Sequence, residues 1–63
     1  MAVDKNMMLD VGSEWRSNNL IFVVDSVIIK EDGTWVYYHN KSTNEEYNCL
    51  VDAFLARVNQ VLQ

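Results

Sequence analysis

The run LIFVVDSVII (residues 20–29), followed by KEDG (30–33) and the run TWVYYHN (34–40), decides the fold. Seven of the ten residues in 20–29 are β-branched or aromatic, and polar residues do not recur at helical spacing. Such a run predicts a strand that is buried over much of both faces. The Asp32-Gly33 pair between the two runs is a frequent β-hairpin signal because both residues tolerate positive φ. The segment therefore predicts two long antiparallel strands joined by a tight turn.

Two sets of large side chains alternate along residues 34–40. Successive residues of a strand point to opposite faces, so one face carries Thr34, Val36 and Tyr38 and the other carries Trp35, Tyr37 and His39. Val36 and Tyr38 suit a core face, which would leave the second set facing outward. Both sets are bulky, so the sequence leaves open which face is buried.

Shorter strands flank this pair. Asn18-Asn19 is a turn signal, and it separates a short strand over 14–17, centred on Trp15, from the long strand. The polar connector 41–44 precedes a further strand over 45–49 that pairs with the Trp35 strand as a second hairpin.

The spacing of apolar residues changes from that of a strand to that of a helix after Cys49. The apolar positions of this tail fall at the i, i+3, i+4, i+7 spacing of one helical face and comprise Val51, Phe54, Leu55, Val58, Val61 and Leu62. This spacing predicts a C-terminal helix over 50–62, with Asn48 as its N-cap. We therefore expect one α+β domain over 1–63: an N-terminal arm (1–11, disordered or packed as a lid), a strongly bent antiparallel sheet of four or five strands (12–49) and one helix.

The chain is short for a stable domain. It has 63 residues and 7.3 kDa, of which 49% are hydrophobic, and a chain of about 60 residues buries only about 60% of its unfolded surface. Cys49 is the only cysteine and His39 the only histidine, so neither an internal disulfide nor a Cys/His zinc site is expected. We expect no metal and no cofactor, and a partner chain is the remaining source of stability.

Charge narrows the class of partner. Nine acidic and five basic residues give a formal net charge of −4 and a pI near 4.6. The basic residues are scattered singly, whereas binding to nucleic-acid phosphates needs clustered cations, so a nucleic-acid partner is disfavoured. The longest apolar run, 20–24, is far shorter than the roughly 20 residues that span a bilayer. The acidic N-terminal segment lacks the features of a secretory signal, and one unpaired thiol favours the cytoplasm.

The residues that carry chemistry do not assemble into a catalytic pattern. His39 and Cys49 are the only Cys-His couple, and the second hairpin places them apart. The acidic pairs 31–32 and 45–46 lie at turns, where carboxylates are solvated and are poor general acids. These observations predict a protein that is not an enzyme.

Two surfaces remain as candidates for binding. The first is an aromatic contact face of Trp35, Tyr37, His39 and Trp15, because Trp and Tyr are enriched among residues that carry binding energy; the alternative is that these rings only wall the core. The second is the surplus of the helical stripe, with Leu50, Leu55, Val58 and Leu62 as a self-association surface of a homodimer. The alternative is a stripe that packs wholly within one copy.

A set of motifs over residues 11–62 resembles a known group of proteins. The motifs are Gly12-Ser13-x-Trp15-Arg16, Phe22-Val23-Val24, Asp32-Gly33-x-Trp35-Val36-x-Tyr38, Glu46-Tyr47-x-Cys49 and Ala53-Phe54-Leu55-x-Arg57. They resemble small uncharacterised proteins encoded by tailed bacteriophages and prophages. The resemblance implies a Src-homology-3-like barrel and an accessory role in the phage life cycle, in the cytoplasm of the bacterial host.

Three functions are therefore open at the level of sequence. The first is a non-enzymatic interaction module that binds, and inhibits or modulates, a host or phage protein. The second is a self-associating structural subunit. The third is a weak binder of single-stranded nucleic acid, which stacked aromatic rings permit and the negative charge disfavours.

Overall fold

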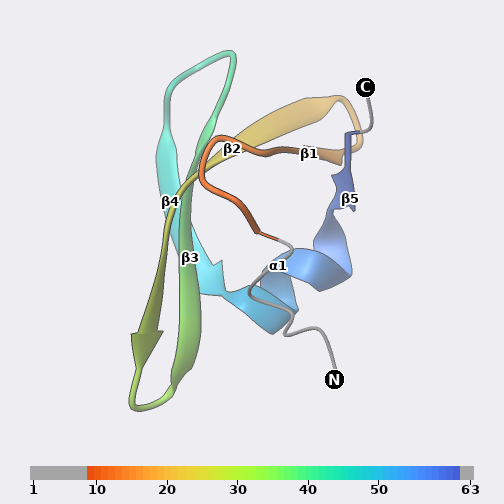
Figure 1. The fold of residues 1–63 in the computed structure, drawn as a ribbon. Coiled ribbons are helices and arrows are strands. Elements are labelled where there is room, and N and C mark those ends of the chain that lie inside the picture. Colours follow the sequence, from red (N-terminus) through yellow and green to blue (C-terminus); the bar gives the residue numbers. More distant parts are fainter. Residues whose placement is uncertain (1–8, 62–63) are drawn as a thin grey trace.

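The computed structural model describes residues 9–61, which form a five-stranded antiparallel sheet and one helix (Figure 1). The elements in chain order are β1 (Glu14–Ser17), β2 (Leu20–Lys30), β3 (Gly33–Asn40), β4 (Glu46–Leu50), α1 (Val51–Arg57) and β5 (Asn59–Gln60). The strand order across the sheet is β4-β3-β2-β1-β5. The predicted small α+β architecture, an antiparallel sheet with one C-terminal helix, is confirmed.

Each turn between the first four strands contains or is followed by a Gly or Asn residue with positive φ. Lys30 pairs with Gly33, so Glu31 and Asp32 form the two-residue turn of the predicted β2–β3 hairpin. Gly33 has a φ of 134°, a conformation that side chains disfavour. The turns between β1 and β2 and between β3 and β4 place Asn18 (φ 56°) and Asn44 (φ 65°) in the left-handed region, which Asn tolerates better than most residues.

A β-bulge bends β2 at its middle. The β2–β3 register shifts between Val24, which pairs with Tyr38, and Ser26, which pairs with Tyr37, and this leaves Asp25 as the extra residue. A bulge bends its strand and increases its twist. It also changes the alternation, so Val24 and Val27, three residues apart, both face the core.

The helix connects the two edges of the bent sheet. β4 and β5 lie at opposite ends of the strand order, where a flat five-stranded sheet would hold them about 19 Å apart. α1 has seven residues and spans only about 10 Å, so the sheet must curl to bring the edges within its reach (Figure 1). The curl does not close into a complete barrel in the described part of the chain, because the order begins at β4 and ends at β5.

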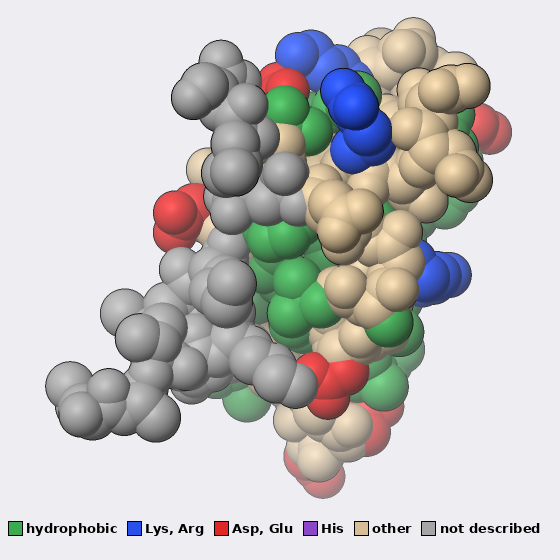
Figure 2. All heavy atoms as spheres, turned by 90° about the vertical axis from the view of Figure 1, so that its right-hand side faces the viewer, with side chains coloured by type: hydrophobic (Ala, Val, Ile, Leu, Met, Phe, Trp, Pro, Cys, Tyr) green, Lys and Arg blue, Asp and Glu red, His purple; other side chains and the backbone are tan. Residues whose placement is uncertain are grey.

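The core lies between the concave inner face of the sheet and α1. Its fully buried side chains are Val24, Val36 and Phe54, and the other buried apolar residues are Leu9, Trp15, Val51 and Val58. Phe54 contacts the rings of Trp15 and Tyr38 at centroid distances of 5.8 and 4.7 Å. Seen from the side that carries α1 and β5, hydrophobic side chains gather in the middle of the molecule (Figure 2).

The predicted helix over 50–62 is present but much shorter, so its predicted bounds are wrong. α1 ends at Arg57, and Asn59–Gln60 form β5, which pairs with Trp15 and Arg16 of β1. A helix of 13 residues gains little from local propensity alone, whereas β5 satisfies backbone groups that β1 would otherwise leave unpaired.

The predicted N-cap is also wrong. Leu50 occupies the N-cap position of α1 without a side-chain cap hydrogen bond, whereas Asn48 lies within β4.

The predicted N-terminal arm is described only from residue 9 onward, and residues 1–8 and 62–63 lie outside the described residues. Leu9 is 3% exposed and belongs to the core. The backbone carbonyl of Asp10 accepts hydrogen bonds from the Ser13 amide (3.0 Å) and the Ser13 hydroxyl (2.6 Å). The described end of the arm is therefore packed against the sheet.

Candidate functional site

The outer face of β2, β3 and β4 carries the candidate site. Val36 is completely buried, and its cross-strand neighbours Val27 and Cys49 pack against the core. Because faces alternate along a strand, Trp35, Tyr37 and His39 lie together on the opposite, outer face of β3. The structure thus brings together three of the four residues predicted for the contact face, and each is half-buried.

The strand register arranges this outer face in three cross-strand rows. The first row is apolar, Ile28-Trp35-Leu50; the second is polar, Ser26-Tyr37-Asn48; the third joins His39 to Val23 on one side and Glu46 on the other. Ile28 is 42% exposed and Leu50 is 38% exposed. Of the three rows, the apolar one therefore lies nearest the β2–β3 turn and the one with His39 and Glu46 lies farthest from it.

Lys30 and Asp32 fix the two outer aromatic rings. The Lys30 ammonium donates a hydrogen bond to the Tyr37 hydroxyl at 2.9 Å and lies 5.3 Å from the ring centroid of Trp35 and 5.5 Å from that of Tyr37. The hydrogen bond to Tyr37 raises the pKa of Lys30. The Trp35 indole N–H donates to Asp32 Oδ1 at 2.9 Å. Both rings are therefore held in a defined orientation, which lowers the entropy that binding would cost.

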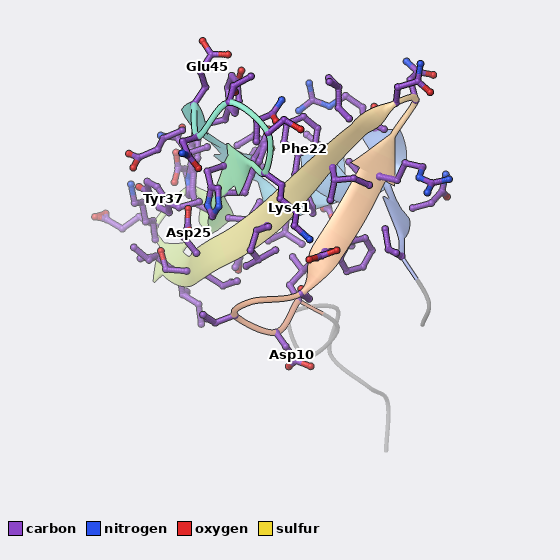
Figure 3. All side chains as sticks on the ribbon, turned by 90° about the horizontal axis from the view of Figure 1, so that it is seen from above. Asp10, Phe22, Asp25, Tyr37, Lys41 and Glu45 are labelled. Atoms are coloured by element: carbon purple, nitrogen blue, oxygen red, sulfur yellow. The ribbon has the colours of Figure 1, made fainter. Side chains whose placement is uncertain are left out.

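The bulge supplies the charged end of the outer face. His39 Nδ1 lies 2.9 Å from Oδ1 and 3.1 Å from Oδ2 of Asp25, and both side chains are partly exposed. Asp25 and Tyr37 lie on the same side of β2 (Figure 3). A carboxylate that orients a histidine in this way occurs in nucleophilic catalysis, where a nucleophile must also lie within hydrogen-bond reach.

The only cysteine does not complete such a site. Cys49 pairs with Val36 on the inner face, and its Sγ lies 3.9 Å from the Tyr38 hydroxyl. Burial, with this hydrogen bond as a second cause, raises the pKa of Tyr38 to about 12. His39 and Cys49 thus lie on opposite faces of the sheet, as the predicted separation of the pair requires.

A shallow hollow of about 490 Å³ lies over the polar end of the outer face. Its lining includes Asp25, Ser26, Tyr37, Glu46 and Asn48. The rest of the lining is Ile28, Tyr38 and Tyr47, so two carboxylates and neutral polar groups share the hollow with aromatic rings and one aliphatic side chain. Within residues 9–61, no group of three or more His, Cys, Asp or Glu side chains is arranged to hold a metal ion.

Trp15 was predicted on the contact face, and this prediction is wrong. Its side chain is 3% exposed, contacts Phe54 and donates its indole N–H to the Ser13 hydroxyl at 2.9 Å. The cause is the register of β1, in which Trp15 pairs with Phe22 on the inner face. The two strands thus direct their tryptophans to opposite faces, and sequence alternation alone could not distinguish them.

The predicted self-association surface on the helix does not form as a continuous stripe. Val58 is 8% exposed and belongs to the core, and Leu55 packs against the core. Leu50 is exposed, but it lies in β4 on the outer face. Leu62 lies outside the described residues. The sequence missed Ile28, whose exposure depends on the change of alternation at the bulge.

Comparison of the chain with protein-family models, with curated proteins and with solved structures finds no match. Among the described residues, no helix has the length and apolar character needed to cross a membrane.

Proposed function

We propose that the protein is a small, non-enzymatic protein-interaction module that binds a basic surface of another protein through the outer face of β2, β3 and β4. The observation that carries the proposal is the apolar row Ile28-Trp35-Leu50, in which Ile28 and Leu50 are exposed and the Trp35 ring, like that of Tyr37 in the next row, is held in a defined orientation. Binding energy in protein interfaces is concentrated in such aromatic anchors with an apolar surround.

Charge supports a basic partner. Asp25, Asp32 and Glu46 lie around the aromatic rings, and the chain has a formal net charge of −4. Lys30 is the cation that the structure places over these rings, and its ammonium already has the Tyr37 hydroxyl as a partner. An arginine or lysine of the partner would therefore meet the carboxylates at the rim, and apolar groups of the partner would pack on the aromatic rings and on Ile28 and Leu50.

The motif resemblance supplies the proposed setting. A phage or prophage accessory protein with this face would act in the cytoplasm of a bacterial host and would inhibit or modulate a host or phage protein by covering its basic site.

A Src-homology-3-like barrel is the proposed finer architecture. Its support is the strand order, in which β5 returns to pair with β1 while α1 draws β4 toward it.

The test is capture of a partner from bacterial lysate by the tagged protein. The double variant Trp35→Ala/Tyr37→Ala should lose the partner, because removal of interface anchors typically costs more than 1 kcal/mol each, roughly tenfold or more in affinity for the pair. Its circular dichroism should match that of the unaltered chain. The variant Leu20→Ala, which truncates a 48% exposed side chain on the β1-paired half of β2, is the matched control and should keep the partner.

Salt and oligonucleotides separate the alternatives. Capture should weaken as salt concentration rises, because exposed charges are screened. Retention of the partner by the double variant would refute the assignment of the face. Binding of single-stranded oligonucleotides at physiological salt would instead favour the nucleic-acid function.

A further inference from the structure

Half of β2 has a backbone edge that no described strand covers. β1 pairs with β2 only as far as Val23, and the last described bonds on that side join Val24 to Ser13 and Gly12. From Ser26 to Lys30, β2 pairs with β3 on one side, and within residues 9–61 it has no strand partner on the other. Alternate residues of a strand direct their N–H and C=O groups to opposite sides, so part of this backbone is available for another strand.

The same segment exposes apolar side chains on both faces of the sheet. Ile28 is 42% exposed on the outer face, and its neighbour Ile29, which points to the other face, is 78% exposed. The β2–β3 hairpin extends away from α1, so the helix does not reach this end (Figure 1). Edges of this kind are usually protected by charges, proline or a covering element, because they otherwise pair with another chain.

We propose that this edge pairs antiparallel with the same edge of a second copy of the chain, in the register that places Ile28 opposite Ile28 of the second copy. A two-fold axis perpendicular to the sheet relates the two edges, so the interface is self-complementary. In this register Val27 faces Ile29 of the second copy on the inner side, and Ser26 faces Lys30 on the outer side. The partner is thus another copy, rather than a foreign peptide.

Side-chain chemistry favours this register. The apolar row Ile28-Trp35-Leu50 of one copy continues into the same row of the other, which makes one apolar row across six strands. Ile28 would then be shielded from water by its counterpart, and burial of apolar surface is the main favourable term in association.

Charges are complementary in the same register. Lys30 lies beside Ser26 of the second copy and therefore next to its Asp25, and the two-fold axis repeats this contact. Within Ser26–Lys30 no two like charges face each other. The next register position sets Asp25 opposite Glu31 of the β2–β3 turn, a like-charge pair that has Lys30 beside it.

The other long free edge is a poorer candidate. Among the residues that the structure describes, β4 has β3 as its strand partner on one side only, but its exposed residues include Glu46, preceded by Glu45 in the turn. Two copies paired antiparallel about Asn48 would place Glu46 opposite the apolar Leu50 of the second copy, and the strand has no cation to compensate the carboxylate. The charge pattern therefore selects β2.

Sedimentation of the full chain over about 1 μM to 1 mM tests the association itself. We expect a reversible monomer–dimer equilibrium. Ile28→Lys places two ammonium groups opposite each other and should raise the dissociation constant about tenfold or more. Leu20→Lys makes the same change at a 48% exposed residue on the β1-paired half of β2, away from the edge, and should leave the dissociation constant unaltered. A monomer throughout the range would overturn the proposal, as would equal effects of both variants.

Cross-linking tests the register and does not depend on the stability of the lysine variants. In a Cys49→Ser background, Ile28→Cys should form an interchain disulfide, because directly opposed residues lie about 4.5–5.5 Å apart at Cα, within disulfide range. Ile29→Cys is more exposed but lies two residues out of register with its counterpart and should cross-link several-fold less. If Ile29→Cys, the more exposed position, instead gave the higher yield of interchain disulfide, the proposed register would be refuted. Species larger than dimers would show that the edge pairs with a different surface of the next copy, which would also contradict the proposed two-fold register.

Discussion

Substitution of Phe54 measures how much of the fold depends on contact between α1 and the sheet. The Phe54 side chain is 1% exposed and contacts Trp15 and Tyr38. Phe54→Ala removes a buried ring and leaves a cavity, which typically costs about 3–5 kcal/mol. A 63-residue chain has a free energy of unfolding of only about 3–9 kcal/mol. We therefore expect Phe54→Ala to lose about 3–5 kcal/mol of its free energy of unfolding, a third or more of the total.

Urea denaturation followed by circular dichroism provides the assay, with Phe54→Leu and Tyr37→Ala as companions. Phe54→Leu keeps most of the volume and should lower the free energy of unfolding by about 1.5 kcal/mol or less. Tyr37→Ala removes an outer ring whose described partner is an exposed lysine, which costs about 0.5–1 kcal/mol. Near-native stability of Phe54→Ala, or a loss no larger than that of Tyr37→Ala, would refute the assignment of inner and outer faces.

Three further predictions concern single residues. Asn40→Ala removes a 5% exposed side chain whose Oδ1 accepts two backbone N–H bonds in the β3–β4 turn, and the unsatisfied amides should cost about 1–3 kcal/mol in urea denaturation, whereas Asn40→Asp should retain most of that stability. Asn44→Gly should be at least as stable as the unaltered chain and Asn44→Ala about 1 kcal/mol less stable by thermal denaturation, because the φ of 65° disfavours a Cβ. Burial raises the pKa of Tyr38 from 10.0 to about 12, so the folded state holds the phenol proton more tightly than the unfolded state does. The free energy of unfolding should therefore fall as the pH rises between these two values, and the part of the fall that is due to Tyr38 should be absent in Tyr38→Phe. An identical pH profile for the variant and the unaltered chain would contradict this prediction.

The strands could be predicted from the sequence because their signals are local. The Asp32-Gly33 pair marks the central hairpin, although the turn itself is Glu31-Asp32 and Gly33, not Asp32, has the positive φ. Asn18 and the polar connector before β4 mark the other turns. Outward placement of Trp35 and Tyr37 also followed from alternation once Val36 was taken as core.

The predictions were wrong where strand pairing between residues far apart in the sequence determined the structure. The helical spacing of Val51, Phe54 and Val58 is real, since all three are buried, but Val58 lies beyond the last helical residue. The residues that follow Val58 pair with the edge of β1 and form β5, and no local sequence pattern indicates that this edge needs a partner. Trp15 was misplaced for the same reason, because its face is set by the register with β2.

The exposed Ile28 row depended on the bulge. A regular strand would place residues 24, 26 and 28 on one face, whereas the inserted Asp25 gives Val24 and Val27 to the core and Ile28 to the outside. Alternation counted along the sequence cannot show where one residue is skipped.

Asp25 therefore links the bend of β2 to the chemistry of the outer face. The single residue that lets the long strand turn around the core also supplies the carboxylate that orients His39. Replacing it to retune the charge of the binding face would also alter the local geometry of the scaffold, so shape and surface chemistry cannot diverge independently at this position.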